Sequence, residues 1–142
     1  MRARLLAPLL LIGLAVAAGV TARETAASRS AATTVNVKVK EWKITPSQTH
    51  ERAGKVTFVV HNTGKLEHEL VVIRTNRPAD DLPLEGRDAN ETGSRGEIGG
   101  VAPGKIGRLT LDLRPGKYVL ICNRSDHHGH YQNGMFAALT VS

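Results

Sequence analysis

The sequence has 142 residues, a formal net charge of +6 and only five aromatic side chains: two Phe, one Trp and two Tyr. Because the positive charge forms no Lys/Arg block and few aromatic residues accompany it, the composition disfavours nucleic-acid binding. Arg2 and Arg4 belong to the N-terminal segment, so the rest of the chain carries +6 − 2 = +4. Its length suits one ordinary domain with a single core.

The first 22 residues have the three parts of a secretory signal peptide. A basic start, residues 1–4, is followed by an apolar run from Leu5 to about Val20 and by a small-residue cleavage site after Ala22. We therefore expect export to the periplasm or another extracytoplasmic space. The apolar run is just long enough to cross a bilayer, so retention as an uncleaved N-terminal anchor is the alternative.

Residues 23–34 are rich in Ala, Ser, Thr and Arg without apolar periodicity, which is typical of a flexible leader. The domain proper, residues 35–142, shows the alternation of half-buried strands: Val35, Val37 and Val39 alternate with polar residues. The strands predicted in this way cover residues 35–44, 55–60, 68–73, 106–113, 118–122 and 135–141.

Gly and Pro separate the predicted strands, and no stretch has the period of a capped amphipathic helix. Residues 75–100 are polar and rich in Asp, Gly and Pro. They are expected to make an excursion across one face, with room for a helical turn near residues 78–82. Six or seven short strands in about 108 residues predict an all-β fold, a Greek-key sandwich or barrel.

One short stretch near the C-terminus, residues 122–135, gathers the residue types that bind soft metals. Cys122 is the only cysteine, and Met135 is the only methionine apart from the initiator. Thiolate, thioether and imidazole together suit a redox-active metal, with copper as the first choice. A lone cysteine is more often an inert core residue. Export into an oxidising space and the neighbouring histidines favour a metal-bound thiolate instead.

A copper site for electron transfer needs two imidazoles and one thiolate in a trigonal plane, with a weak axial thioether. His68 begins a predicted apolar strand, Cys122 ends another, and Met135 begins the last one. The chain thus offers one imidazole from an early strand and three further ligands from a loop between two late strands.

Four segments carry a family resemblance, namely residues 62–72, 96–104, 113–123 and 129–135. In this order they resemble the small exported blue copper proteins of the cupredoxin family, particularly its sulfocyanin-like and rusticyanin-like members. The resemblance covers essentially all of residues 35–142. It implies a cupredoxin fold and one type 1 copper ion, with His68, Cys122 and His130 as equatorial ligands and Met135 as the axial ligand.

The ligand loop, residues 122–135, is three residues longer than the family pattern. The family usually places its histidine five positions after the cysteine, where this chain has His127, whereas His130 lies eight positions after Cys122. His130 keeps the Gly-His-Tyr-x-x-Gly-Met context, whose glycines suit a tight loop around a metal. We therefore expect His130 to be the ligand. We expect His127 and His128 to be solvated. The alternatives are that one of them replaces His130 as a ligand, or that they form a second, weak metal site.

These features predict an electron carrier and not an enzyme. As a monomer, it would cycle between Cu(II) and Cu(I), exchanging single electrons with a donor and an acceptor protein. The alternative is a copper-binding, delivery or storage protein whose longer loop holds metal without efficient electron transfer. A metal-free binding module is a third interpretation. We also expect the Glu69 N–H and groups around Asn123 to donate hydrogen bonds to the cysteine sulfur. Tyr131 and Phe136 are expected to help form an apolar docking surface around an exposed edge of the ligand histidine.

Overall fold

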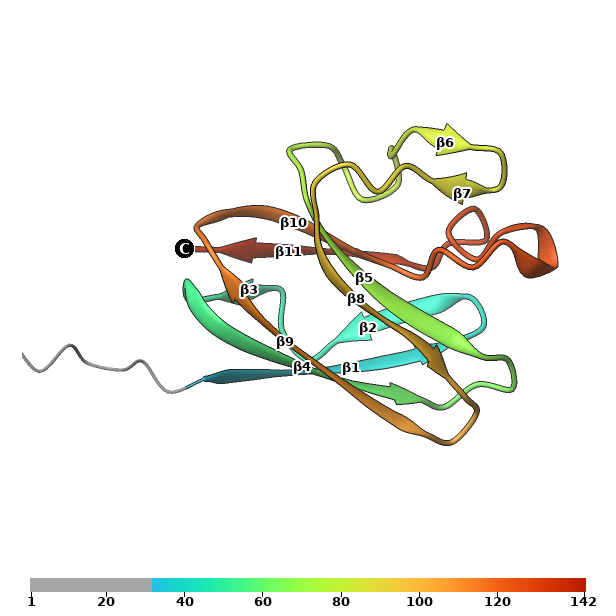
Figure 1. Cartoon of the computed structure of the whole chain (residues 1–142), viewed down its shortest axis with the longest axis horizontal. Helices are drawn as coiled ribbons and strands as arrows, with labels where there is room; N and C mark the ends of the chain where they lie inside the picture. The colour runs from blue at the N-terminus through green and yellow to red at the C-terminus, as the bar shows by residue number, and fades with distance from the viewer. Residues whose placement is uncertain (1–31) are drawn as a thin grey trace, which may run out of the picture.

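The computed structural model describes residues 32–142, so the predicted signal peptide (residues 1–22) and the leader up to residue 31 lie outside the described residues. Residues 32–142 form two main β-sheets packed face to face, together with a separate two-stranded sheet (Figure 1). They contain no α-helix, and their one helical element is the short 3₁₀ helix η1 (Asp126–His128). None of their helical segments is long and apolar enough to cross a membrane. This all-β architecture confirms the predicted sandwich.

The first sheet pairs its N-terminal strand with a strand later in the sequence. Its members are β1 (Thr33–Lys40), β2 (Lys43–Pro46), β4 (Gly54–Asn62) and β9 (Ile106–Leu113). They lie in the order β2–β1–β4–β9, with β1 parallel to β4 and the other pairs antiparallel. Val35, Val37 and Val39 are fully buried, as their alternation predicted.

The second sheet supplies the strands that end near the ligand loop. Its members are β3 (His50–Glu51), β5 (His68–Arg74), β8 (Ser94–Val101), β10 (Gly116–Ile121) and β11 (Phe136–Val141). They lie in the order β3–β11–β10–β5–β8. The central strand β10 pairs antiparallel with both β11 and β5. Both flanks of the ligand loop are therefore fixed by the middle of a sheet.

Two expectations about the strands need correction. The predicted strand 35–44 is a hairpin: β1 ends at Lys40, Glu41 and Trp42 form the turn, and β2 returns antiparallel. The excursion of residues 75–100 contains a small hairpin, β6 (Leu84–Glu85) with β7 (Asp88–Ala89), and most of β8. Near Pro78 the chain makes a single turn, closed by the Asp81 N–H donating to the Pro78 carbonyl at 3.2 Å, and no helix.

The core between the sheets reaches directly to the ligand loop. Phe58, Leu70 and Leu120 are fully buried and belong to one hydrophobic cluster that also includes Cys122 and Met135. Burying a large apolar side chain contributes about 1.5–3 kcal/mol relative to leaving it exposed. The packing that stabilises the sandwich therefore also holds the sulfur-bearing side chains in place.

Candidate metal centre

Three side chains from distant parts of the sequence converge at one end of the sandwich. His68 begins β5, Cys122 follows β10, and His130 lies in the loop before β11. The His68 Nδ1 atom is 3.2 Å from the His130 Nδ1 atom. The Cys122 Sγ atom is 3.8 Å from the former and 3.3 Å from the latter. All three side chains are fully buried.

The spacing of these donor atoms suits a single metal ion. Three donors at about 2.0–2.3 Å from a common ion and 120° apart would be separated by about 3.5–3.8 Å. The observed separations run from 3.2 to 3.8 Å. Two imidazole nitrogens and a thiolate are also the planar donor set of trigonal copper sites. The cluster therefore needs little rearrangement to hold copper.

Strand register explains why His68 and Cys122 meet. In the antiparallel pair of β5 and β10, Val71 lies opposite Ile121. The residues that precede Val71, which include His68, and the residue that follows Ile121, which is Cys122, therefore lie at the same end of the sheet. The Cys122 N–H also donates to the Met135 carbonyl at 3.1 Å, which continues the pairing of β10 and β11 by one step.

The loop of residues 122–135 folds so that His130 turns inward. The His130 N–H donates to the Arg124 carbonyl at 2.8 Å, and the His130 carbonyl accepts from the Met135 N–H at 3.1 Å. Gly129 has φ of 88°, and a Cβ there would lie 2.5 Å from the Arg87 carbonyl oxygen, so only glycine fits. The context around His130 thus makes the tight turn that the sequence predicted.

His127 and His128 remain outside the cluster. Both are exposed and both have left-handed backbone conformations, with φ of 50° and 72°. The centre of the His127 ring is 6.4 Å from that of His130. Of the three loop histidines, the structure brings only His130 into the cluster with His68 and Cys122.

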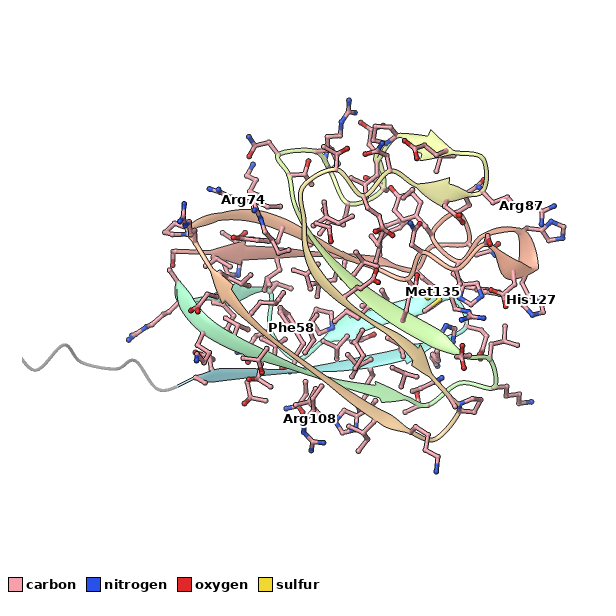
Figure 2. The ribbon with its side chains drawn as sticks, viewed as in Figure 1. Phe58, Arg74, Arg87, Arg108, His127 and Met135 are labelled. Carbon is pink, nitrogen blue, oxygen red and sulfur yellow. The ribbon has the colours of Figure 1, made fainter. Side chains whose placement is uncertain are left out.

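Met135 lies beside the donor cluster of His68, Cys122 and His130. Its side chain is fully buried in the same hydrophobic cluster as Cys122. Figure 2 shows it at the end of the sandwich that carries the loop, inward of His127. The short hydrogen-bonded link between its backbone and that of His130 fixes the two residues relative to each other.

The cysteine sulfur receives a backbone hydrogen bond. The Glu69 N–H donates to Cys122 Sγ at 3.4 Å, as the sequence analysis expected. The Glu69 carboxylate in turn accepts from the Asn123 N–H at 2.8 Å, and the Asn123 side chain bonds both backbone groups of Ala89 on β7. The small hairpin of residues 84–89 therefore secures Asn123, the residue that follows the cysteine.

Glu41, which the sequence analysis missed, holds the outer nitrogen of His68. Its Oε1 atom lies 3.2 Å from His68 Nε2 and also accepts from the Lys65 and Leu66 N–H groups at 2.8 and 2.7 Å. Burial opposes ionisation of this carboxyl, but the hydrogen bonds from Leu66, Lys65 and His68 lower its pKa to about 2. Glu41 is therefore a carboxylate at neutral pH.

The outer nitrogen of His130 has a different environment. His130 Nε2 lies 3.2 Å from Asp126 Oδ1, but the two atoms are not aligned as a hydrogen bond, and this buried nitrogen has no other partner among residues 32–142. Arg124 lies 3.3 Å from the same oxygen and 2.6 Å from Glu67. The extra loop residues thus place a small charge network over His130.

Burial sets the protonation states of the three donors in the absence of metal. It lowers the pKa of His68 and of His130, although Glu41 and Asp126 respectively oppose the shift. The two imidazoles are therefore neutral at pH 7, which is the form that binds metals. Burial also raises the pKa of the Cys122 thiol to about 11, so metal binding must displace its proton.

The predicted docking surface is wrong in its details. His130 has no exposed edge, because its side chain is fully buried. Tyr131 is also buried, and its hydroxyl bonds Leu82 and Ala79 at 2.9 Å each. Trp42 covers the histidine instead: its ring meets that of His130 edge-on at 5.1 Å, and the side chain is 36% exposed.

Comparisons with known proteins place the fold. A scan against protein-family models and a search of curated proteins gave no match. Among solved structures, the reduced auracyanin of Roseiflexus castenholzii matches 79% of this chain and 98% of its own at 21% identity, with a TM-score of 0.56. Auracyanin B matches 78% of this chain and 89% of its own at 21% identity, with a TM-score of 0.58. Reduced rusticyanin matches 79% and 81% at 19% identity, with a TM-score of 0.54.

These neighbours are cupredoxins. At 19–21% sequence identity, the likeness shows a shared fold and nothing beyond it. The donor cluster of His68, Cys122 and His130 comes from this chain's own geometry. The chain therefore has the cupredoxin fold and carries a buried His–Cys–His cluster that fits a type 1 copper site.

Proposed function

We propose that this protein is an extracytoplasmic type 1 copper protein that carries single electrons between redox partners. His68, Cys122 and His130 would hold the copper through two imidazole nitrogens and a thiolate, and Met135 would be a further ligand through its thioether. The observation that carries the proposal is the buried set of three donor atoms at 3.2–3.8 Å from one another. A fold shared with auracyanin and with rusticyanin, which is described as a copper protein, supports it.

Copper, when bound, would supply a Cu(II)/Cu(I) couple. The protein's part is to keep the donor geometry nearly the same in both oxidation states. Strands β5 and β10 fix His68 and Cys122, while loop hydrogen bonds fix His130. The Glu69 N–H bonds the sulfur, and such bonds tune the potential of thiolate-ligated metals.

Burial of the donors favours a carrier over a delivery protein. A metal that is passed on must be reached by the receiving ligands, whereas His68, Cys122, His130 and Met135 are all fully buried. An electron needs only a short path to the surface. Trp42, in edge contact with His130 and partly exposed, offers that path. The net positive charge favours partners with acidic docking surfaces.

The proposal is tested by adding Cu(II) to the purified metal-free protein. An intense blue thiolate-to-copper absorption is expected, which a one-electron reductant bleaches and an oxidant restores over repeated cycles. Cys122→Ser should abolish the absorption. His50→Ala, which removes an exposed histidine of β3, should leave it unchanged and serves as the control.

Two outcomes would count against the carrier. Absence of blue absorption in the wild type would contradict the type 1 site. A blue site that loses copper to a chelator on each reduction would instead support the delivery protein, because a carrier must retain the metal through both oxidation states.

A further inference from the structure

A second group of chemically active side chains lies at the end of the sandwich opposite the metal centre. His68 is the first residue of β5 and Arg74 is the last, so the strand spans about 20 Å between the two ends. Figure 2 shows Arg74 at the far end of the molecule from Met135 and His127. Three further basic residues gather around Arg74: Arg95 on β8, Arg114 after β9 and Lys117 on β10.

These side chains border two adjoining cavities. The first, of about 250 Å³, is lined by Arg74, Arg95, Asp112, Arg114 and Tyr118. The second, of about 320 Å³, shares Arg74 and Arg95 with the first and adds Lys117. Four cations and a single carboxylate therefore face a space large enough for a small solute.

The backbone and neighbouring side chains hold the first cavity in shape. The Arg74 Nη2 donates to the Pro115 carbonyl at 2.8 Å. Its guanidinium also lies against Gly116, where a Cβ would come within 2.9 Å of Arg74 Nε. The buried Tyr118 forms the floor, and its hydroxyl donates to the Arg114 carbonyl at 2.8 Å. The guanidinium of Arg74 is thus positioned before any ligand arrives.

No ion pair of the described part of the chain neutralises the arginines of this cavity. Among residues 32–142, the arginines with a carboxylate oxygen within 4.0 Å are Arg77 and Arg124. Arg74, Arg95 and Arg114 have none, although Asp112 lines the same cavity. Bringing like charges together costs free energy, which an anion between them offsets.

We infer that Arg74, Arg95 and Arg114 form a binding site for a phosphate-type oxyanion. Guanidinium groups present planar pairs of N–H donors that match phosphate oxygens. The oxyanion has two sources, a free ion or a phospholipid headgroup. The second is worth testing because β1 begins at this end, where Thr33 lies opposite Val56 and Gly54 opposite Leu113, and the apolar residues 5–20 precede β1 in the sequence.

Titration of the purified protein with inorganic phosphate, at ionic strength held constant with sodium chloride, tests the site directly. Calorimetry should detect saturable binding. Arg95→Gln and Arg114→Gln should each weaken it roughly tenfold or more, as expected for the loss of charged hydrogen bonds. Arg108→Gln is the matched control, because Arg108 is an exposed arginine on β9 without a carboxylate partner among the described residues and outside both cavities. It should bind phosphate as the wild type does.

Co-sedimentation with vesicles distinguishes the two sources. Binding to phosphatidylglycerol but not phosphatidylcholine vesicles, lost in Arg95→Gln and reversed by phosphate, would identify a headgroup. Phosphate binding without vesicle binding would identify a free ion. The inference is overturned if neither probe binds, or if Arg108→Gln reduces binding as much as the cavity variants. None of these readouts involves copper, so the result is independent of the proposed electron carrier.

Discussion

At the residue scale, Glu41 is the side chain that gives His68 its particular character. A carboxylate bonded to the outer nitrogen of a ligand histidine fixes the ring orientation and makes the other nitrogen a stronger donor. Two backbone N–H groups hold Glu41 in place, so its negative charge stays 3.2 Å from the imidazole. This charge should stabilise Cu(II) more than Cu(I).

Glu41→Gln is therefore expected to raise the reduction potential of the copper-loaded protein. The amide keeps an oxygen that accepts hydrogen bonds but loses the charge. A tenfold selective loss of Cu(II) affinity would raise the potential by about 59 mV. Voltammetry measures the change, and Glu97→Gln, which removes an exposed carboxylate on β8, is the control. An equal shift in both variants would show that only overall charge matters.

Ionisation of the Cys122 thiol should make the stability of the metal-free protein depend on pH. Burial raises its pKa from 9.0 to about 11 in the folded state. The folded protein therefore keeps the proton to higher pH than the unfolded chain does. Stability from this group is fully present below pH 9 and is lost as the pH rises to about 11, by up to about 2–3 kcal/mol.

Urea unfolding of metal-free wild type and Cys122→Ser, at pH values below 9 and near 11, measures this loss. Other groups also titrate in alkaline solution, but both proteins share them. The wild type should lose more stability than the variant. Equal losses would mean that the thiol ionises in the folded protein as readily as in the unfolded chain.

At the scale of elements, the positions of the three histidines in the ligand loop predict how replacing each one affects copper binding. His130→Ala should abolish the blue absorption, because this variant removes one of the three clustered donors. His127→Ala and His128→Ala should keep the absorption, since both side chains are exposed. Copper titration followed by absorption spectroscopy compares the three variants. Loss of colour with His127→Ala alone would mean that copper recruits His127 and rearranges the loop.

The sequence predicts those elements whose side chains alternate clearly. β9 was predicted with its observed ends, and β5 within one residue, because their apolar residues recur at every second position or fill a continuous buried run. β8 was missed because it contains three glycines, and because its pairing with β5 depends on a strand distant in sequence. Local pattern carries no signal for such pairing.

The residues of the candidate site were likewise predictable only in part. His68, Cys122 and His130 were found from their chemistry and context, and the structure brings them together. Glu41 was missed because it reaches His68 only through the turn between β1 and β2, which looked like one continuous strand. The cover over His130 was also unpredictable, since Trp42 comes from that same turn.

At the scale of the whole molecule, the candidate metal centre and the core are one packed unit. Cys122 and Met135 belong to the hydrophobic cluster that includes Phe58 and Leu70 from the two facing sheets. The donor atoms of His68 and Cys122, which lie 54 positions apart in the sequence, also join β5 to the loop before β11. Copper would therefore connect strands that separate only when the whole sandwich unfolds.

Copper binding is accordingly expected to stabilise the entire domain and not only the loop. A ligand that binds the folded state alone adds about 2.7 kcal/mol when its free concentration is 100 times its Kd. Urea unfolding with and without Cu(II) should show a higher midpoint by circular dichroism, which reports the sheets. Cys122→Ser should show no such increase.

The fluorescence of Trp42, the only tryptophan, provides a second probe next to His130. If the domain unfolds as one unit, both probes should shift to the same midpoint when copper is added. A shift in fluorescence alone would mean that the loop opens separately from the sandwich. In that case the donors would be held by the loop and not by the core, and the rigid cage required of an electron carrier would be absent.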